Sequence, residues 1–172
     1  MSLRIIALAI LVPITLQAGC FKAGKPAFLQ VQMCLENKQG VILFKDLMQD
    51  IAQEEGMDYL DRSDKTQREW DTLNIAPDYS ILHIGATGDE GFGFHAANMG
   101  LSEYEVMIAF SDGFDSAGAR QFADRTVARL RQQWVVHTVP SERGALPMVG
   151  CPSSRKLPGE ADTSKAGFPE AR

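Results

Sequence analysis

The sequence predicts an α+β domain, a ferredoxin-like split β-α-β sandwich in which two helices cover one face of a mainly antiparallel sheet. Two segments, 37–56 and 116–133, carry apolar residues at three- and four-residue spacing, the period of an amphipathic helix. The segments around them alternate apolar and polar residues, which is typical of half-buried strands. The chain order is strand, helix, strand, strand pair, strand, helix, strand, and this order indicates the split arrangement.

The first strand and helix are the clearest elements of the N-terminal half. In the strand 28–35 the apolar residues share one face, namely Leu29, Val31, Met33 and Leu35. Cys34 falls on the polar face, where a bond to a distant segment is sterically possible. The helix 37–56 ends at Gly56, a residue type that closes many helices in the left-handed conformation. Residues 57–62 then predict a short, charged edge strand.

The rest of the domain contains the remaining strands and the second helix. The polar segment 63–79 predicts a connection with a single helical turn. Further strands are predicted at 79–85, through Phe92, Phe94 and Ala96, at 104–110 and at 134–139. The domain therefore spans residues 28–140. Prolines and glycines interrupt any period in the tail, residues 141–172, which is predicted to be disordered.

The charge of the chain excludes two classes of partner. The 17 basic and 22 acidic residues give a net charge of −5. Residues 20–140 carry 11 basic and 18 acidic side chains, which is −7, whereas the tail has 5 against 4. The acidity therefore belongs to the folded part. Binding to nucleic acid or electrostatic binding to anionic lipid is not expected, because both need clustered cations.

The N-terminus has the features of an export signal. Arg4 precedes an apolar run of about ten residues, 5–14, which is well short of the ~20 needed to span a bilayer. The following residues, Leu16-Gln17-Ala18-Gly19-Cys20, resemble the lipobox of bacterial lipoproteins, with Gln17 where that family usually has an aliphatic residue. The resemblance implies that residues 1–19 are a signal peptide and that Cys20 becomes the lipidated first residue.

The lipoprotein resemblance also implies a location. Cys20 would carry a diacylglycerol and an acyl chain such as palmitate, and several chains anchor a protein stably. Because Phe21 and not aspartate follows, the resemblance implies transport to the outer membrane, with residues 20–27 as a tether in the periplasm. Two alternatives stay open. One is a plain secretory signal cut near Ala18, and the other is an uncleaved anchor or core helix.

The remaining cysteines then have one possible pairing. With Cys20 lipidated, Cys34 and Cys151 lie in an oxidising compartment, where a disulfide is expected. The alternative is a reactive thiol. Neither cysteine has a neighbouring histidine or a Cys-x-x-Cys partner to lower its pKa, so the disulfide is favoured.

No motif in the chain predicts catalysis, a cofactor or a metal. The glycine-rich segment 85–93 lacks the Lys-Ser/Thr of a phosphate loop and contains Asp89 and Glu90, which would repel phosphate. Three histidines could act as general bases, namely His83, His95 and His137, and the first and last fall on strands that could be neighbours. Their spacing matches no metal-ligand pattern. In 111–116 the Gly-x-Ser-x-Gly elbow is absent, and Asp115 or Ser116 is better explained as a helix N-cap.

The leading functional prediction is a membrane-anchored, non-enzymatic module that binds a protein partner in the cell envelope, as an inhibitor, an immunity-like protein or an accessory part of a complex. The expected recognition element is the hairpin 85–100, with five contact residues: Asp89, Glu90, Phe92, Phe94 and Met99. If both phenylalanines instead turn inward, they only complete the sheet.

Two other functions stay open. A small periplasmic enzyme would place a histidine in a pocket beside a carboxylate, whereas a binding module would expose an apolar patch. A structural envelope protein is the third possibility.

Overall fold

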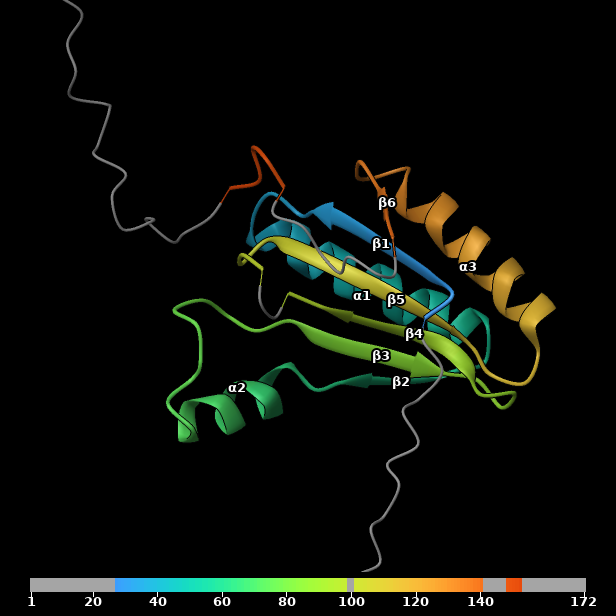
Figure 1. The fold of residues 1–172 in the computed structure, drawn as a ribbon, viewed down its shortest axis with the longest axis horizontal. Helices are drawn as coiled ribbons and strands as arrows, with labels where there is room; N and C mark the ends of the chain where they lie inside the picture. Colours follow the sequence, from blue (N-terminus) through green and yellow to red (C-terminus); the bar gives the residue numbers. More distant parts are fainter. Residues whose placement is uncertain (1–26, 99–100, 141–147, 153–172) are drawn as a thin grey trace, which may run out of the picture.

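The computed structural model of this chain describes residues 27–98, 101–140 and 148–152 (Figure 1). The predicted signal peptide, Cys20, Met99 and most of the predicted tail lie outside these residues. The elements in chain order are β1 (Leu29–Cys34), α1 (Lys38–Glu54), β2 (Asp58–Asp61), α2 (Ser63–Thr72), β3 (His83–Thr87), β4 (Phe92–Ala97), β5 (Glu105–Asp112), α3 (Ser116–Leu130) and β6 (His137–Val139). The α+β class is therefore confirmed.

All strands of the described chain belong to one six-stranded sheet with the order β2-β3-β4-β5-β1-β6. Each neighbouring pair is antiparallel. Helix α1 leads from β1 past three strands to the far edge at β2, and α3 leads from β5 past β1 to the other edge at β6. Both helices therefore join strands that are parallel to each other but separated in the sheet.

Two helices, α1 and α3, cover the same face of the sheet and form one core with it. The largest fully buried side chains of this core include Phe44 and Met48 of α1, Phe122 and Leu130 of α3, and Met33, Ile84, Ile108 and Phe110 of the sheet. No helix of the described residues covers the other face, which we call the open face. Small and polar side chains of the central strands lie there, and alternation along each strand separates them from the core.

The sequence-based prediction of two helices is wrong, because α2 is a third. It occupies ten residues of the segment predicted as a connection, and its only buried residues are Ser63 and Thr66. Hydrogen bonds attach it to β3. The Ser63 hydroxyl accepts from the backbone N–H of His83 at 3.0 Å, and Gln67 Oε1 accepts from Ile81 N–H at 3.0 Å. A helix held by polar contacts has no apolar stripe that a sequence pattern could reveal.

Two strands are also shorter than predicted. β3 begins at His83 and not at residue 79, because the Asn98 side chain forms hydrogen bonds with the backbone of the residues that precede the strand. Asn98 Oδ1 accepts from Leu82 N–H at 2.8 Å, and Asn98 Nδ2 donates to Ser80 O at 3.0 Å. β6 contains three residues, paired with Gln30–Gln32 of β1. Among the described residues, no helix is both long enough and apolar enough to cross a membrane.

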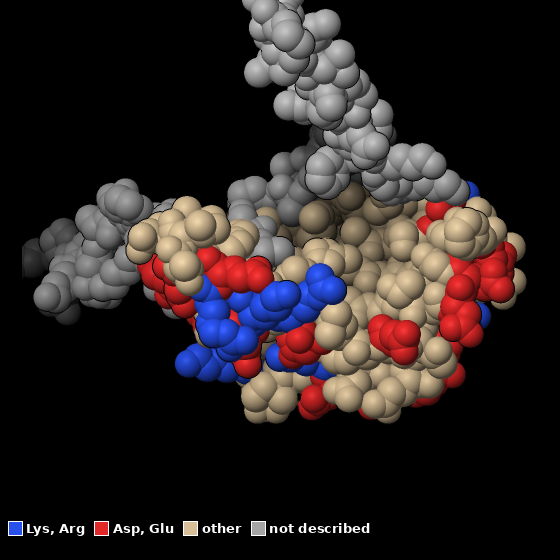
Figure 2. All heavy atoms as spheres, turned by 90° about the horizontal axis from the view of Figure 1, so that it is seen from below, with Lys and Arg blue, Asp and Glu red and all other residues tan. Residues whose placement is uncertain are grey.

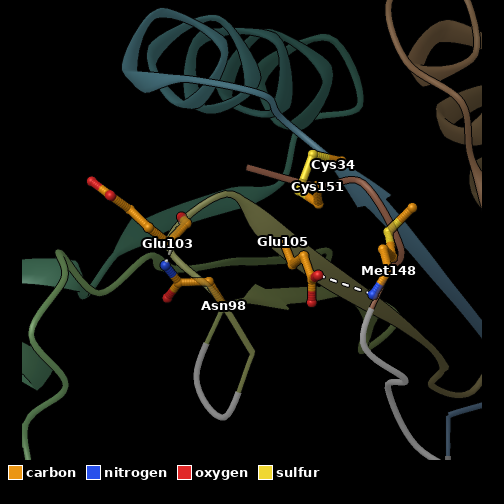
Figure 3. The surroundings of a disulfide bond; sticks show 6 residues. All are labelled: Cys34, Asn98, Glu103, Glu105, Met148 and Cys151. Atoms are coloured by element: carbon orange, nitrogen blue, oxygen red, sulfur yellow. Dashed lines mark hydrogen bonds between the residues drawn. A yellow bond between two sulfur atoms is a disulfide. The ribbon is translucent and has the colours of Figure 1, made fainter. Parts of the chain in front are cut away.

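The predicted disulfide is present at one end of the sheet (Figure 3). Cys34 on the open face of β1 is bonded to Cys151, with their Cα atoms 5.6 Å apart. Beside it, the buried carboxylate of Glu105 accepts a hydrogen bond from Met148 N–H at 2.9 Å. The described piece of the C-terminal region, residues 148–152, is thus fixed to the sheet at two points.

Candidate functional site

The predicted recognition hairpin exists, but its phenylalanines do not form an exposed patch. Asp89 and Glu90 are exposed in the turn between β3 and β4. Phe94 is 4% exposed and belongs to the core, so the prediction that it contacts a partner is corrected. Phe92 is half-buried, with its ring 5.7 Å from that of Phe122. Met99 lies outside the described residues.

The inward direction of Phe94 follows from strand pairing. It lies opposite Ala86 of β3 and Phe110 of β5, and all three residues face α1 and α3. Its ring stacks on that of Phe122 with 6.5 Å between centroids. The alternate residues of β4, including His95, lie on the open face.

A different phenylalanine is exposed at the same end of the sheet. The turn 88–91 meets the loop that joins β5 to α3, and we call residues 88–91 and 112–115 together the tip. Phe114 in the second loop is 91% exposed. Its backbone N–H donates to Glu90 O at 2.9 Å, so the main chain that carries the ring is tied to the hairpin.

Two glycines allow the tip loops to approach each other. Gly113 has a φ of +50°, and a Cβ there would collide with the backbone of Glu90 and Phe92. Gly91 has a φ of +76°, and the Phe114 ring passes beside it: a Cβ on Gly91 would lie 3.7 Å from that ring. Any side chain at residue 113 would therefore separate the two loops.

The tip loops are acidic. Segments 87–91 and 111–116 contain four acidic residues and no lysine or arginine; the four are Asp89, Glu90, Asp112 and Asp115. Asp115 caps α3, as the sequence predicts, because its Oδ1 accepts from the backbone N–H of Ala117 and Gly118. Seen from below, carboxylates with almost no basic side chains lie at the end of the domain opposite α2, whereas acidic and basic side chains are mixed toward α2 (Figure 2).

The histidines form a second cluster, on the open face. The rings of His83 on β3 and His95 on β4 meet edge to face with 4.7 Å between centroids. Thr66 Oγ1 of α2 is 2.7 Å from His83 Nδ1. His137 lies on β6, three strands away from β4 and four from β3, so the expectation that His83 and His137 are neighbours is wrong.

Partial desolvation lowers the pKa of both clustered histidines. The Arg62 charge lowers the pKa of His83 further, while Asp61 and Glu69 oppose this effect. For His95, the neighbouring His83 and then Arg62 add to the desolvation. Both imidazoles are therefore mainly neutral at pH 7.

His83, His95 and Asp58 line one hollow on the open face, so a histidine does lie in a pocket together with a carboxylate. The described hydrogen bonds give His83 a hydroxyl partner and give neither ring a carboxylate. Within the described residues, no group of three or more histidine, cysteine, aspartate or glutamate side chains could hold a metal ion.

The sequence pattern missed Phe114, although Asp-Gly-Phe-Asp at 112–115 was a usable signal. An aromatic residue between a turn glycine and a helix cap lies outside both the strand and the helix period. No protein-family model matches the chain, and no curated protein matches its sequence significantly.

Proposed function

We propose that the chain is a lipid-anchored, non-enzymatic domain that binds a protein partner through the tip. The observation that carries this proposal is the Phe114 ring, which is 91% exposed although its backbone is hydrogen-bonded to the neighbouring loop. Phe114 is the one aromatic side chain among the large hydrophobic residues that are exposed in the described part of the chain. Aromatic residues, phenylalanine included, are also enriched in the core of protein–protein interfaces.

The charges of the tip define the chemistry of the partner. The tip combines four acidic residues with one large exposed apolar side chain and has no lysine or arginine. The complementary surface is an apolar pocket bordered by lysine or arginine, and charge complementarity of this kind speeds association and selects the partner. Such a surface fits an inhibitor, an immunity-like protein or an accessory subunit of an envelope complex.

The lipid anchor and the tip lie at the same end of the domain in this proposal. β1 begins at Leu29, opposite Phe110 near the end of β5, and Phe28 N–H donates to Phe110 O at 3.0 Å. From Cys20 to Ala27 the chain can span at most about 25 Å, at roughly 3.5 Å per residue. A lipid on Cys20 would thus keep the tip near the bilayer, and the partner would be a membrane protein or a protein bound at the membrane surface.

Phe114→Ala is expected to weaken partner binding strongly without destabilising the domain. Loss of a central aromatic contact costs about 2 kcal/mol or more, which weakens binding roughly 30-fold. The melting temperature should stay unchanged, because the ring packs against little of the folded chain. The measurement is co-purification from cross-linked envelopes, with a photoreactive phenylalanine analogue at residue 114 to identify the partner.

Leu73 provides the matched control for this experiment. It is 65% exposed at the end of α2, far from the tip in Figure 1. Leu73→Ala should retain the partner, and the photoreactive analogue at residue 73 should not yield the same adduct. Exchanging both Asp89 and Glu90 for lysine should weaken the same complex. Equal recovery of the partner by Phe114→Ala and the unaltered protein would refute the proposal.

Cys20→Ser tests the anchor separately from the tip. Without the thiol no lipid can be attached, so the protein should move from the outer-membrane fraction to the soluble periplasmic fraction. Fractionation followed by immunoblotting measures this, and incorporation of labelled palmitate gives a second readout. A Cys20→Ser protein that still sediments with membranes would contradict the lipoprotein assignment.

We further propose that the domain is an extended ferredoxin-like sandwich. The two connections through α1 and α3 support this, because each joins separated parallel strands as in that fold. The departure is α2 with the β3–β4 hairpin, which is inserted between β2 and β5 in both chain and sheet order. The tip turn belongs to this inserted hairpin.

A further inference from the structure

The open face contains a hollow that the proposed function does not use. Its volume is about 570 Å³, within the 300–1,000 Å³ typical of small-ligand sites. Strands β2 to β5 form it, and in the middle row His95 lies between Gly85 of β3 and Ala109 of β5. Because Gly85 and Ala109 have little or no side chain, the His95 ring projects from a shallow part of the open face.

Arg62 lies at one side of this hollow. It follows β2, and its backbone N–H donates to His83 O at 2.8 Å, which fixes the residue beside the histidines. The described residues provide no ion pair for its guanidinium, whereas nearby Lys45 is paired with Asp61. Arg62 is also close enough to lower the pKa of both histidines.

The two histidines add donors to the same space. The hydrogen bond between Thr66 Oγ1 and Nδ1 of His83 leaves Nε2 of this ring for a ligand. Among the described residues, no hydrogen bond engages the ring of His95. Three side chains that can donate an N–H, those of Arg62, His83 and His95, therefore line one hollow.

We propose that this hollow binds a small oxyanion, a carboxylate or phosphoryl group, held by Arg62, His83 and His95. Arginine recognises the planar edge of such groups with two hydrogen bonds, and bonds to a charged acceptor are about twice as strong as neutral ones. Asp58 also lines the hollow, four residues before Arg62 on β2 and nearer the tip. Its charge repels an anion, so the oxyanion lies at the Arg62 end.

Binding in this position is coupled to protonation. Partial desolvation and Arg62 hold the pKa of both histidines below its ordinary value, while Asp61 and Glu69 partly offset this for His83. A bound anion favours the protonated rings and raises both pKa values. Affinity for an anion of constant charge therefore rises as the pH falls from about 7 through the range in which His83 and His95 of the unliganded protein become protonated.

Sulfate is the probe, because its charge stays constant between pH 5 and pH 8. The histidine ring nitrogens of the protein as isolated from cells are followed by ¹⁵N NMR while sulfate is added at fixed ionic strength. We expect saturable shifts at His83 and His95 and none at His137, with tighter binding at pH 5.5 than at pH 7.5. Chloride should not reproduce the shifts.

The variants distinguish a specific site from general attraction. Arg62→Gln should weaken sulfate binding about tenfold or more, whereas substitution of Arg68, an exposed arginine of α2 outside the hollow, by glutamine should leave it unchanged. His95→Gln should weaken the pH dependence. The proposal is overturned if the shifts do not saturate, if Arg62→Gln binds as tightly as the unaltered protein, or if Arg68→Gln has the same effect.

Acetate and phosphate then identify the class of ligand. Tighter binding of phosphate than of acetate assigns a phosphoryl group, and the reverse order assigns a carboxylate. Failure of both to compete with sulfate would overturn the site. Because the tip variant Phe114→Ala leaves the hollow intact, it should bind sulfate normally, so the two proposals can fail independently.

Discussion

Replacement of Cys34 and Cys151 together by serine is expected to lower the free energy of unfolding by up to about 4–5 kcal/mol. The bond joins residues 117 positions apart, so its loss frees a very long loop in the unfolded chain. The native state also loses a fixed contact, because Met148 N–H donates to the buried Glu105 only while residues 148–152 are held there. Urea denaturation without reductant measures the difference.

Single replacements serve as controls for this prediction. Cys34→Ser and Cys151→Ser each break the same bond, so each should lose about as much stability as the double variant. Addition of reductant to the unaltered protein should bring it to the same value. A loss below about 1 kcal/mol would mean that the bond contributes little beyond the packing of the sheet.

Phe94→Ala is expected to lower the free energy of unfolding by about 3–5 kcal/mol, the usual cost of removing a fully buried phenylalanine ring. The ring is 4% exposed and stacks on Phe122. Phe92→Ala should cost less because that ring is half-buried. Phe114→Ala should change stability by no more than about 0.5 kcal/mol, as surface substitutions usually do.

This order of the three phenylalanines can be measured by one set of denaturation curves. It tests the direction of each ring, because an outward Phe94 would behave like Phe114. Phe94→Leu is the matched control: it keeps most of the apolar volume and should recover part of the lost stability. A small loss for Phe94→Ala together with a large one for Phe114→Ala would contradict the structure of the tip.

The sequence predicted the elements whose buried residues recur at a regular spacing along the chain. α1 and α3 have apolar residues on one side, and the alternation of 28–35 predicted both β1 and the open-face position of Cys34. α2 could not be predicted in this way. Its buried residues are Ser63 and Thr66, and the groups that hold it come from residues 81–83, later in the chain.

The candidate sites depended on information that is not local. β4 alternates phenylalanine with glycine and histidine, but the sequence alone does not say which face of the sheet α1 and α3 cover. The contact between His83 and His95 follows from the register that places Gly85 opposite His95, and the turn 88–91 sets that register. Phe114 is exposed because Gly113 brings its loop against the hairpin.

The position of the disulfide determines how the protein would carry mechanical load. β1 begins beside the tip and ends at Cys34, and Cys34 is bonded to Cys151. With a lipid on Cys20, as proposed, tension between the membrane and the C-terminus would pass along residues 20–34 and through the sulfur atoms. Residues 35–150 form a closed loop outside this path. A pull on the tail would therefore act first on β1 and on its hydrogen bonds to β5 and β6, while the covalent chain of residues 35–150 stays outside the path of tension.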